Sequence, residues 1–291
     1  MTDQTLQRQR QQLPPSVMKI VLGHELARQR RQASMTQEDS AGVLGCKSQK
    51  IGFIETGTSG VKPLELGALL DAYDVTDTDR AYISDLAEEA NHRAKKGSFS
   101  MRFRDHLRLL VDMEPTCQRL WSYQAMVVPG LLQTKDYMRT AFRTWRPSPH
   151  PDEIDADTRD RLARQRVLDS PGQKFWFILD EAALRRPVGD SAIMRAQVYR
   201  LIEAIDQPNI ELQVVPFGVG YYMGEGHEYT ILGYDRDISI NVVYREHYDG
   251  GEYVCDPDKA AAYLTLWEQQ QAAALGPEQT RRFLLDLAAS L

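Results

Sequence analysis

One short segment of the chain combines residue types that can hydrogen-bond to the edges of DNA bases. The apolar spacing predicts a helix over 48–55, with Ile51 and Ile54 facing the protein core. Ser48 and Gln49 then lie on the outer side at the start of this helix. A helix presented in this way can enter the major groove, which is about 12 Å wide, with its first residues at base edges. An ordinary helical hairpin within a bundle is the alternative.

A second helix and a tight turn must hold this segment in place. Thr36 is followed three residues later by Asp39, which is the spacing of a capping box, so a helix is expected to begin there. It is expected to run to Leu44 and to stop at Gly45, because glycine tolerates the left-handed conformation of a tight turn. Ala41 lies on the inner side, where a small residue lets the following helix cross closely. The two segments together have the organisation of a helix-turn-helix.

The composition of the 291 residues is that of a globular protein, with 42% hydrophobic and 26% charged residues. The three cysteines, Cys46, Cys117 and Cys255, form no CxxC pair, which excludes a disulfide framework and a zinc ribbon and favours a reducing cytoplasm. The N-terminal residues lack the apolar stretch of a signal peptide, and no stretch approaches the roughly 20 apolar residues of a membrane span. A cytoplasmic protein without membrane contact is expected.

The sequence carries no motif typical of an enzyme active site. The six histidines lack the spacing of a metal site, and neither a GxSxG nucleophile motif nor the GK[ST] of a phosphate-binding loop occurs. Asp180 and Glu181, with Arg185 and Arg186 one turn later, could do acid–base chemistry. Acidic residues followed by basic ones are, however, more typical of the start and end of a helix. We therefore expect a protein that is not an enzyme and that uses no cofactor or metal.

The charge is distributed unevenly along the chain. Residues 1–96 hold 13 basic and 13 acidic side chains, so the whole net charge of −6 falls on residues 97–291. A phosphate backbone repels an acidic surface. Contact with DNA is therefore expected from the N-terminal third alone.

Turn residues and hydrophobic spacing predict a multidomain protein with an all-α head and an α+β C-terminal body. We expect a disordered leader over 1–15, a helix-turn-helix domain over 16–76, a connecting helix and linker over 77–100, and the body over 101–291. The helices of the head are expected at 16–32, 36–44, 48–55, 63–73 and 77–94. Those of the body are expected at 107–123, 131–143, 152–168, 191–205, 257–274 and 277–289. Strands are expected at 174–179, 210–217, 228–234 and 238–244.

The head carries a long, ordered pattern of residues between positions 22 and 73. The pattern reads Leu22-Gly23-x-Glu25-Leu26, Met35-Thr36-Gln37-Glu38, Leu44-Gly45, Lys50-Ile51-x-x-Ile54-Glu55-x-Gly57 and Leu69-Leu70-x-x-Tyr73. It resembles the lambda-repressor-like (Xre/Cro-type) helix-turn-helix family. The resemblance implies that the helix beginning near residue 47 is the recognition helix. Because one such helix reads only a few base pairs, we expect a homodimer on an inverted repeat, with half-sites about 10 bp apart or a multiple of that spacing.

The resemblance also implies roles for individual side chains. Gln37, at the start of the preceding helix, becomes a candidate phosphate contact. Gln49 is expected to pair with adenine N6 and N7, and Lys50 to reach a phosphate or a guanine. Ser48 either caps the helix or donates to a base or a phosphate. Lys47 stands where the family often has Ser or Thr, and it is expected to contact a phosphate.

The remaining positions of interest in the head each have two possible uses. Gly52, where the family usually has a polar residue, either permits close approach to DNA or weakens the site. Phe53, also polar in the family, either touches a thymine methyl group or folds back onto the head. Glu55 is expected to be bonded inside the head. Four basic residues contact phosphates or form a solvated surface, namely Lys62, Arg28, Arg30 and Arg31.

The body carries several specific strings of residues. They are Val128-Pro129-Gly130-Leu131-Leu132-Gln133-Thr134 with Tyr137, Arg164-Gln165-x-x-Leu168, Leu179-Asp180-Glu181-x-x-Leu184, Val188-Gly189, Gln197, Val214-x-Pro216-Phe217 and Val243-Tyr244-x-Glu246. Together they resemble the large C-terminal domain, of undefined biochemistry, that is fused to Xre-type heads in actinomycete regulators of the WhiJ type. The resemblance implies a transcription regulator. Many such regulators are encoded beside a small partner protein, and the pair is sometimes discussed as antitoxin-like.

Two segments of the body contain turn-forming residues. The first, 128–130, is predicted to be a turn that feeds a helix, and we favour a structural role over a partner-binding one. The second, 218–224, lacks the glycine spacing of a dinucleotide loop and is predicted to be a flexible hairpin connection. Four side chains in or beside it could line a ligand or partner surface, namely Tyr221, Tyr222, Met223 and His227.

Two hypotheses from different classes follow. The first is a cytoplasmic, dimeric, sequence-specific transcription regulator that binds a double-stranded DNA operator through 48–55. Its body would serve dimerisation, signal binding or partner binding. The alternative is an antitoxin-like interaction protein that binds a small partner protein and regulates its own gene through the head. A ligand sensor or enzyme in the body is a third possibility, and no catalytic motif supports it.

Overall fold

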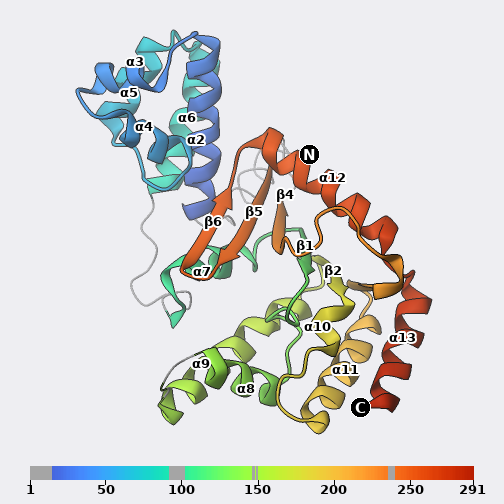
Figure 1. Cartoon of the computed structure of the whole chain (residues 1–291). Helices are drawn as coiled ribbons and strands as arrows, with labels where there is room; N and C mark the ends of the chain where they lie inside the picture. Colours follow the sequence, from blue (N-terminus) through green and yellow to red (C-terminus); the bar gives the residue numbers. More distant parts are fainter. Residues whose placement is uncertain (1–14, 92–101, 146–147, 149, 235–239) are drawn as a thin grey trace. The chain divides into compact units, whose positions relative to one another are not determined.

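The computed structural model describes residues 15–91, 102–145, 148, 150–234 and 240–291. The chain divides into two compact units, Met1–Met101 and Arg102–Leu291, which we call the head and the body and describe separately (Figure 1). The predicted leader apart from Pro15, the end of the predicted linker and residues 238–239 of a predicted strand lie outside the described residues. Within the residues that the structure describes, no helix is both long enough and apolar enough to span a bilayer.

The described part of the head is all helical, as predicted. Its helices are α2 (Pro15–Gln32), α3 (Gln37–Leu44), α4 (Ser48–Glu55), α5 (Pro63–Ala72) and α6 (Asp77–Asn91). The capping box before α3 is present, because Thr36 accepts from the Asp39 amide and the Asp39 carboxylate accepts from the Thr36 amide. Gly45 ends α3 in the left-handed conformation, with a φ of 60°.

The helices of the head enclose one apolar core. It includes Leu22 and Leu26 from α2, Ile51 and Ile54 from α4, and Leu69 from α5, and all five side chains are buried. Helix α6 packs along α2 through Ile83 and Leu86 and lies inside the first unit. Residues of α6 therefore contribute to the core of the head.

Two glycines let α2 approach the α4 segment closely. A Cβ atom at Gly23 of α2 would lie 2.4 Å from the carbonyl oxygen of Ile54. A Cβ atom at Gly57, just after α4, would lie 2.7 Å from the backbone of Ile20, and Gly57 has a positive φ of 71°. Any larger residue at either position would push α4 away from α2.

The body is built on a mixed six-stranded sheet, which confirms the predicted α+β class. The strands are β1 (Arg119–Gln124), β2 (Lys174–Asp180), β3 (Ile210–Val215), β4 (Tyr229–Tyr234), β5 (Ile240–His247) and β6 (Gly250–Val254). They lie in the order β3-β2-β1-β4-β5-β6. β1, β2 and β3 are parallel, whereas β4, β5 and β6 continue from β1 as antiparallel neighbours.

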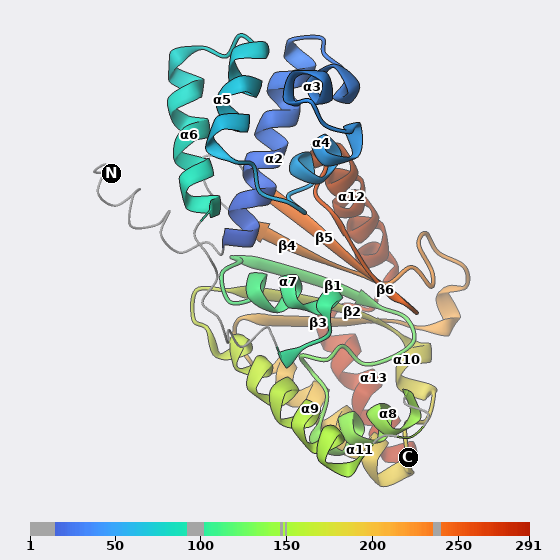
Figure 2. The same ribbon diagram turned by 90° about the vertical axis from the view of Figure 1, so that its left-hand side faces the viewer.

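Helices connect the parallel strands and cover the sheet. They are α7 (Asp105–Met113), α8 (Lys135–Trp145), α9 (Pro151–Arg164), α10 (Glu181–Arg185), α11 (Ser191–Ile205), α12 (Pro257–Ala273) and α13 (Pro277–Ser290), with short 3-10 turns η2 (Gln165–Asp169) and η3 (Phe217–Val219). α12 packs on a sheet face whose core includes Tyr123, Ile231 and Trp267. Figure 2 shows α8, α9 and α11 gathered on the side of the parallel strands.

The structure corrects four predictions for the body. The helix predicted over 107–123 ends at Met113, and 119–124 form β1 because this segment pairs with strands on both sides. The strand β6 was not predicted, because two glycines at its start lower its strand propensity. The segment 218–224 is not a hairpin connection, because β3 and β4 are separated in the sheet by β2 and β1. The helix predicted over 131–143 begins later, at Lys135.

Candidate nucleic-acid interface

Helix α4 is anchored by one side and offers the other to solvent. Ile51 and Ile54 are 1% and 2% exposed, respectively. Ser48 and Gln49, on the opposite side, are exposed, and Phe53 is 44% exposed. The arrangement matches the sequence expectation of an inner apolar edge and an outer polar start. The exposed residues can therefore be approached by a large partner.

The start of α4 keeps free backbone donors. Lys47 occupies the N-cap position with extended backbone angles, and among the described residues no side chain caps the helix there. Ser48 is the first helical residue, so its hydroxyl does not serve as the cap that we considered from the sequence. Unpaired amides at a helix N-terminus favour a phosphate group. Lys47 is exposed beside them and adds a positive charge.

A buried network fixes Gln37 against α4. The Glu55 carboxylate accepts from Arg30 at 2.6 and 3.0 Å and from Gln37 Nε2 at 2.8 Å. Glu55 is 8% exposed, so its expected structural role inside the head is confirmed. The bond to Glu55 raises the pKa of Arg30 and outweighs the effect of burial. Gln37 is exposed as a residue, but its amide nitrogen is held inward and its position is set by the network.

Lys50 points away from the polar start of α4 and pairs with α5. Its Nζ lies 2.6 Å from Glu65 Oε1, and this bond raises the pKa of Lys50 and lowers the pKa of Glu65. Contact between Lys50 and DNA therefore requires competition with Glu65. The sequence pattern did not reveal this partner, because Glu65 lies on another helix. Lys62, at the N-cap of α5, is exposed.

The packing of the head does not require a glycine at position 52. A Cβ atom there would lie 3.7 Å from Gln37 Oε1, which is ordinary van der Waals contact. The glycine therefore costs helix propensity without relieving a clash in the free protein. Together with the neighbouring Phe53, it leaves a low, partly apolar surface on the outer side of α4.

The three arginines near the end of α2 differ in burial, since Arg28 and Arg31 are exposed and Arg30 is half-buried. Arg28 is bonded to Glu25, and Arg30 is bonded to Glu55. Arg31 is exposed. Of the three arginines, Arg31 is therefore the one best placed for contact with a partner.

The four residues suggested as a surface of the body differ in exposure and bonding. Tyr221, Met223 and His227 are exposed. The hydroxyl of Tyr222 instead donates to Asp180 Oδ2 at 2.6 Å and lies 2.6 Å from the hydroxyl of Tyr123. Burial and these bonds raise the pKa of Tyr222. Tyr222 thus fastens its loop to the ends of β1 and β2.

The acidic pair at the end of β2 has the helix-starting role favoured from the sequence. Asp180 caps α10 by accepting from the Ala182 amide at 2.7 Å. Glu181 accepts from the Phe217 amide at 2.7 Å and is paired with Arg185.

Across the described ranges, no three His, Cys, Asp or Glu side chains lie close enough together to hold a metal ion. Burial raises the pKa of the thiols of Cys117 and Cys255 to about 12.

Comparison with known families assigns both units. A model described as a helix-turn-helix domain matches residues 21–83, and one described as a domain of unknown function (DUF5753) matches residues 107–286. The chain therefore belongs to the family of this domain of unknown function, with a helix-turn-helix domain in front of it. A helix-turn-helix domain is typical of DNA-binding regulators. No curated protein and no solved structure matches the chain.

Proposed function

We propose that this protein is a cytoplasmic, sequence-specific transcription regulator of the Xre type that inserts α4 into the major groove. The carrying observation is that Ile51 and Ile54 bury one side of α4 while Ser48, Gln49 and Phe53 remain exposed. The free amides at the start of α4 and the exposed Lys47 supply the phosphate contacts that fix its register. Gln37 and Lys62 extend these contacts to α3 and α5.

Two features of the sequence agree with this proposal. The resemblance of the body to that of WhiJ-type regulators supports a role in gene regulation, and the surplus of acidic residues beyond position 96 leaves DNA contact to the head. One recognition helix reads few base pairs, so we propose a homodimer on an inverted repeat. Light scattering of the protein with and without its selected operator measures this stoichiometry. One protein molecule per operator would contradict the dimer.

Selection from a random double-stranded DNA library identifies the operator, and fluorescence anisotropy on the selected duplex then tests the reading helix. We expect Gln49→Ala to cost about 1–3 kcal/mol of binding and to relax preference at one base pair in each half-site. Affinity should also fall steeply with salt as counterions are released.

Ser84→Ala is the matched control for Gln49→Ala. Ser84 is exposed on α6, and its hydroxyl donates within its own helix to the Arg80 carbonyl at 2.8 Å. The control should bind like the unchanged protein. Unaltered base discrimination in Gln49→Ala would show that α4 is not the reading helix.

A second candidate function is the antitoxin-like binding of a small partner protein by the body. Exposed apolar side chains on the connection between β3 and β4 favour it, namely Phe217, Val219, Tyr221 and Met223. Such a cluster is more typical of an interaction surface than of a solvated loop. Purification of the full chain from its native host tests this proposal. A stoichiometric small protein that is lost from a Tyr221→Ser, Met223→Ser variant would support it, and the chain purifying alone would contradict it.

A further inference from the structure

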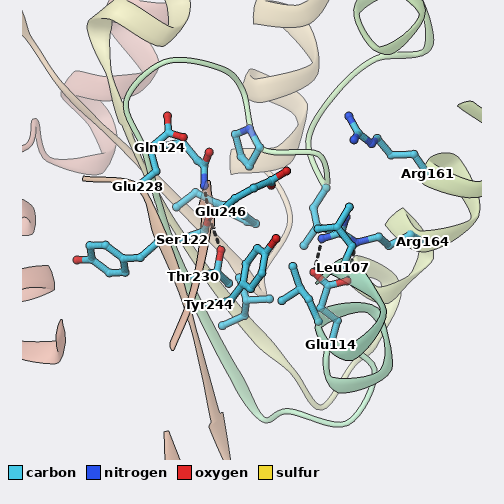
Figure 3. A pocket seen from close by; sticks show the side chains of 16 residues that line it. Leu107, Glu114, Ser122, Gln124, Arg161, Arg164, Glu228, Thr230, Tyr244 and Glu246 are labelled. Carbon is cyan, nitrogen blue, oxygen red and sulfur yellow. Dashed lines mark hydrogen bonds and ion pairs between the residues drawn. The ribbon is translucent and has the colours of Figure 1, made fainter. Parts of the chain in front are cut away.

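The body contains a polar cavity of about 90 Å³ between the sheet and the helices α7 and α9 (Figure 3). Its floor follows from strand register. Ser122 on β1 pairs with Thr230 on β4, and Thr230 pairs with Tyr244 on β5, so the three side chains form one row across the sheet. Side chains two residues further along each strand share the same face. They form a second row at the same cavity, namely Gln124, Glu228 and Glu246.

One wall of the cavity is a buried ion pair that is already satisfied. Arg164 of α9 donates to both carboxylate oxygens of Glu114, with distances of 2.7 and 2.6 Å. Glu114 is 1% exposed. The two charges compensate each other, so this wall is neutral overall and rigid. A ligand must find its partners among the other groups.

The hydroxyl of Tyr244 lacks a partner. Tyr244 is 4% exposed, and within the described part of the chain no group hydrogen-bonds to its Oη. Figure 3 shows this hydroxyl pointing toward the space between Glu246 and Arg164. Gly251 on β6 makes room for the ring, because a Cβ atom there would lie 2.6 Å from Tyr244 Cε2. Buried hydroxyls nearly always have a partner, and for Tyr244 a water or a ligand in the cavity can supply it.

Two side chains of opposite charge, Arg161 and Glu246, line the cavity. Arg161 donates to Gln133 Oε1 at 2.7 Å and stacks on Phe142, and no carboxylate among the described residues forms an ion pair with it. Burial and the neighbouring Arg164 lower the pKa of Arg161 to about 10, so it stays cationic at neutral pH. On the other side, Glu246 Oε1 lies 3.6 Å from His106 Nε2. Arg161 and Glu246 both line the cavity (Figure 3).

We propose that this cavity binds a small zwitterion of the size of glycine or alanine. Its carboxylate would meet Arg161, its ammonium group would meet Glu246, and the Tyr244 hydroxyl would bond to the bound molecule. The volume fits this class, since a cavity of roughly 150 Å³ holds benzene with its six carbon atoms. Arg161 is held by Gln133 and Phe142, and Glu246 lies near His106, so a zwitterion adds an oppositely charged partner to both side chains, whereas a simple anion or cation adds one to a single side chain. The inference concerns the body and does not depend on the proposed DNA binding.

Isothermal titration calorimetry of the full chain tests the proposal with glycine, L-alanine and L-serine as probes and with acetate and methylammonium as controls. We expect at least one amino acid to bind and both single-charge controls to bind at least about tenfold more weakly. Absence of binding by all three amino acids up to about 10 mM would overturn the proposal. So would equal binding of acetate or methylammonium.

Two variants separate ligand recognition from folding. Tyr244→Phe removes only the unpartnered hydroxyl, so the melting temperature should stay the same or rise while amino-acid affinity falls at least about tenfold. Glu246→Gln should weaken binding similarly, because it removes the charge opposite the ammonium group. Tyr248→Phe is the matched control, since Tyr248 is 93% exposed and does not line the cavity. Unchanged affinity in both cavity variants would refute the site.

Discussion

Arg30 of α2 and Glu55 of α4 form a two-point ion pair inside the head, at 2.6 and 3.0 Å. Their side chains are 12% and 8% exposed, so water screens the pair little. The same carboxylate accepts from Gln37 of α3. Glu55 thereby fixes the positions of α2, α3 and α4 relative to one another, and these helices present the candidate interface.

Replacing Glu55 by glutamine is expected to destabilise the head. The substitution keeps the shape but leaves the Arg30 guanidinium with a neutral partner, which should cost about 3 kcal/mol. Hydrogen exchange of amides in α2 and α4 measures the loss. Glu88→Gln, at an exposed position of α6, is the control. All four tryptophans lie beyond residue 101, so their fluorescence should report an unchanged body. A loss below about 1 kcal/mol would show that the pair contributes little.

Two glycine-to-alanine substitutions in the head should have opposite effects. Gly23→Ala forces α2 and α4 apart, because the new methyl group would meet the Ile54 carbonyl, and we expect a loss of about 1–3 kcal/mol. Gly52→Ala meets no close neighbour and should stabilise α4 by up to about 1 kcal/mol. Thermal unfolding followed by circular dichroism compares the two variants. Equal effects would mean that the close crossing at Gly23 is not required. If Gly52→Ala also weakens DNA binding, Gly52 serves close approach to the duplex.

The ion pair between Lys50 and Glu65 should make the stability of the head depend on pH. Because Lys50 lowers the pKa of Glu65, the stabilising effect is present above the ordinary value of 4.5 and is lost as pH falls through the lowered pKa. The hydrogen bond to Glu65 also raises the pKa of Lys50. At high pH the stabilising effect of the pair is therefore lost only as pH rises through a value above the ordinary 10.5. A carbon-13 NMR titration of the Glu65 carboxyl group should give a midpoint below 4.5 that rises in Lys50→Met. An unchanged midpoint in this variant would contradict the pairing in solution.

Removing the hydroxyl of Tyr222 should loosen the connection between β3 and β4. Tyr222→Phe deprives Asp180 of a hydrogen bond at 2.6 Å to a carboxylate, which should cost about 1–3 kcal/mol. Urea unfolding followed by tryptophan fluorescence measures this loss in the body. Tyr221→Phe, at a neighbouring position that is 89% exposed, should change nothing. Equal stability of the two variants would show that Tyr222 does not fasten the loop.

The head was predictable because its signals are local. Thr36 with Asp39, Gly45, and the pair Ile51 and Ile54 each act within a few residues, and they set the ends and inner sides of α3 and α4. The partners of Lys50 and Arg30 were not predictable in the same way. Each lies on a different helix, so the bond depends on packing and not on sequence spacing.

The body was less predictable because its sheet is assembled from distant segments. The sequence predicts a helix over the residues that form β1. The strand depends on pairing with β2 and β4, which are distant in the sequence, and no local pattern indicates these partners. The polar cavity does have a signal in the sequence. Polar residues alternate along single strands, as in Ser122 with Gln124 and Tyr244 with Glu246. Such alternation places them on one sheet face, although they belong to no catalytic or binding motif.

The strand order has a consequence for synthesis of the chain on the ribosome. Leu120 of β1 pairs with Leu232 of β4, so β1 cannot gain its second neighbour until most of the polypeptide has been made. The head, whose described helices end at Asn91, can be complete long before then. A nascent chain that stalls between these points would carry a finished head together with an open strand edge, which is a template for aggregation.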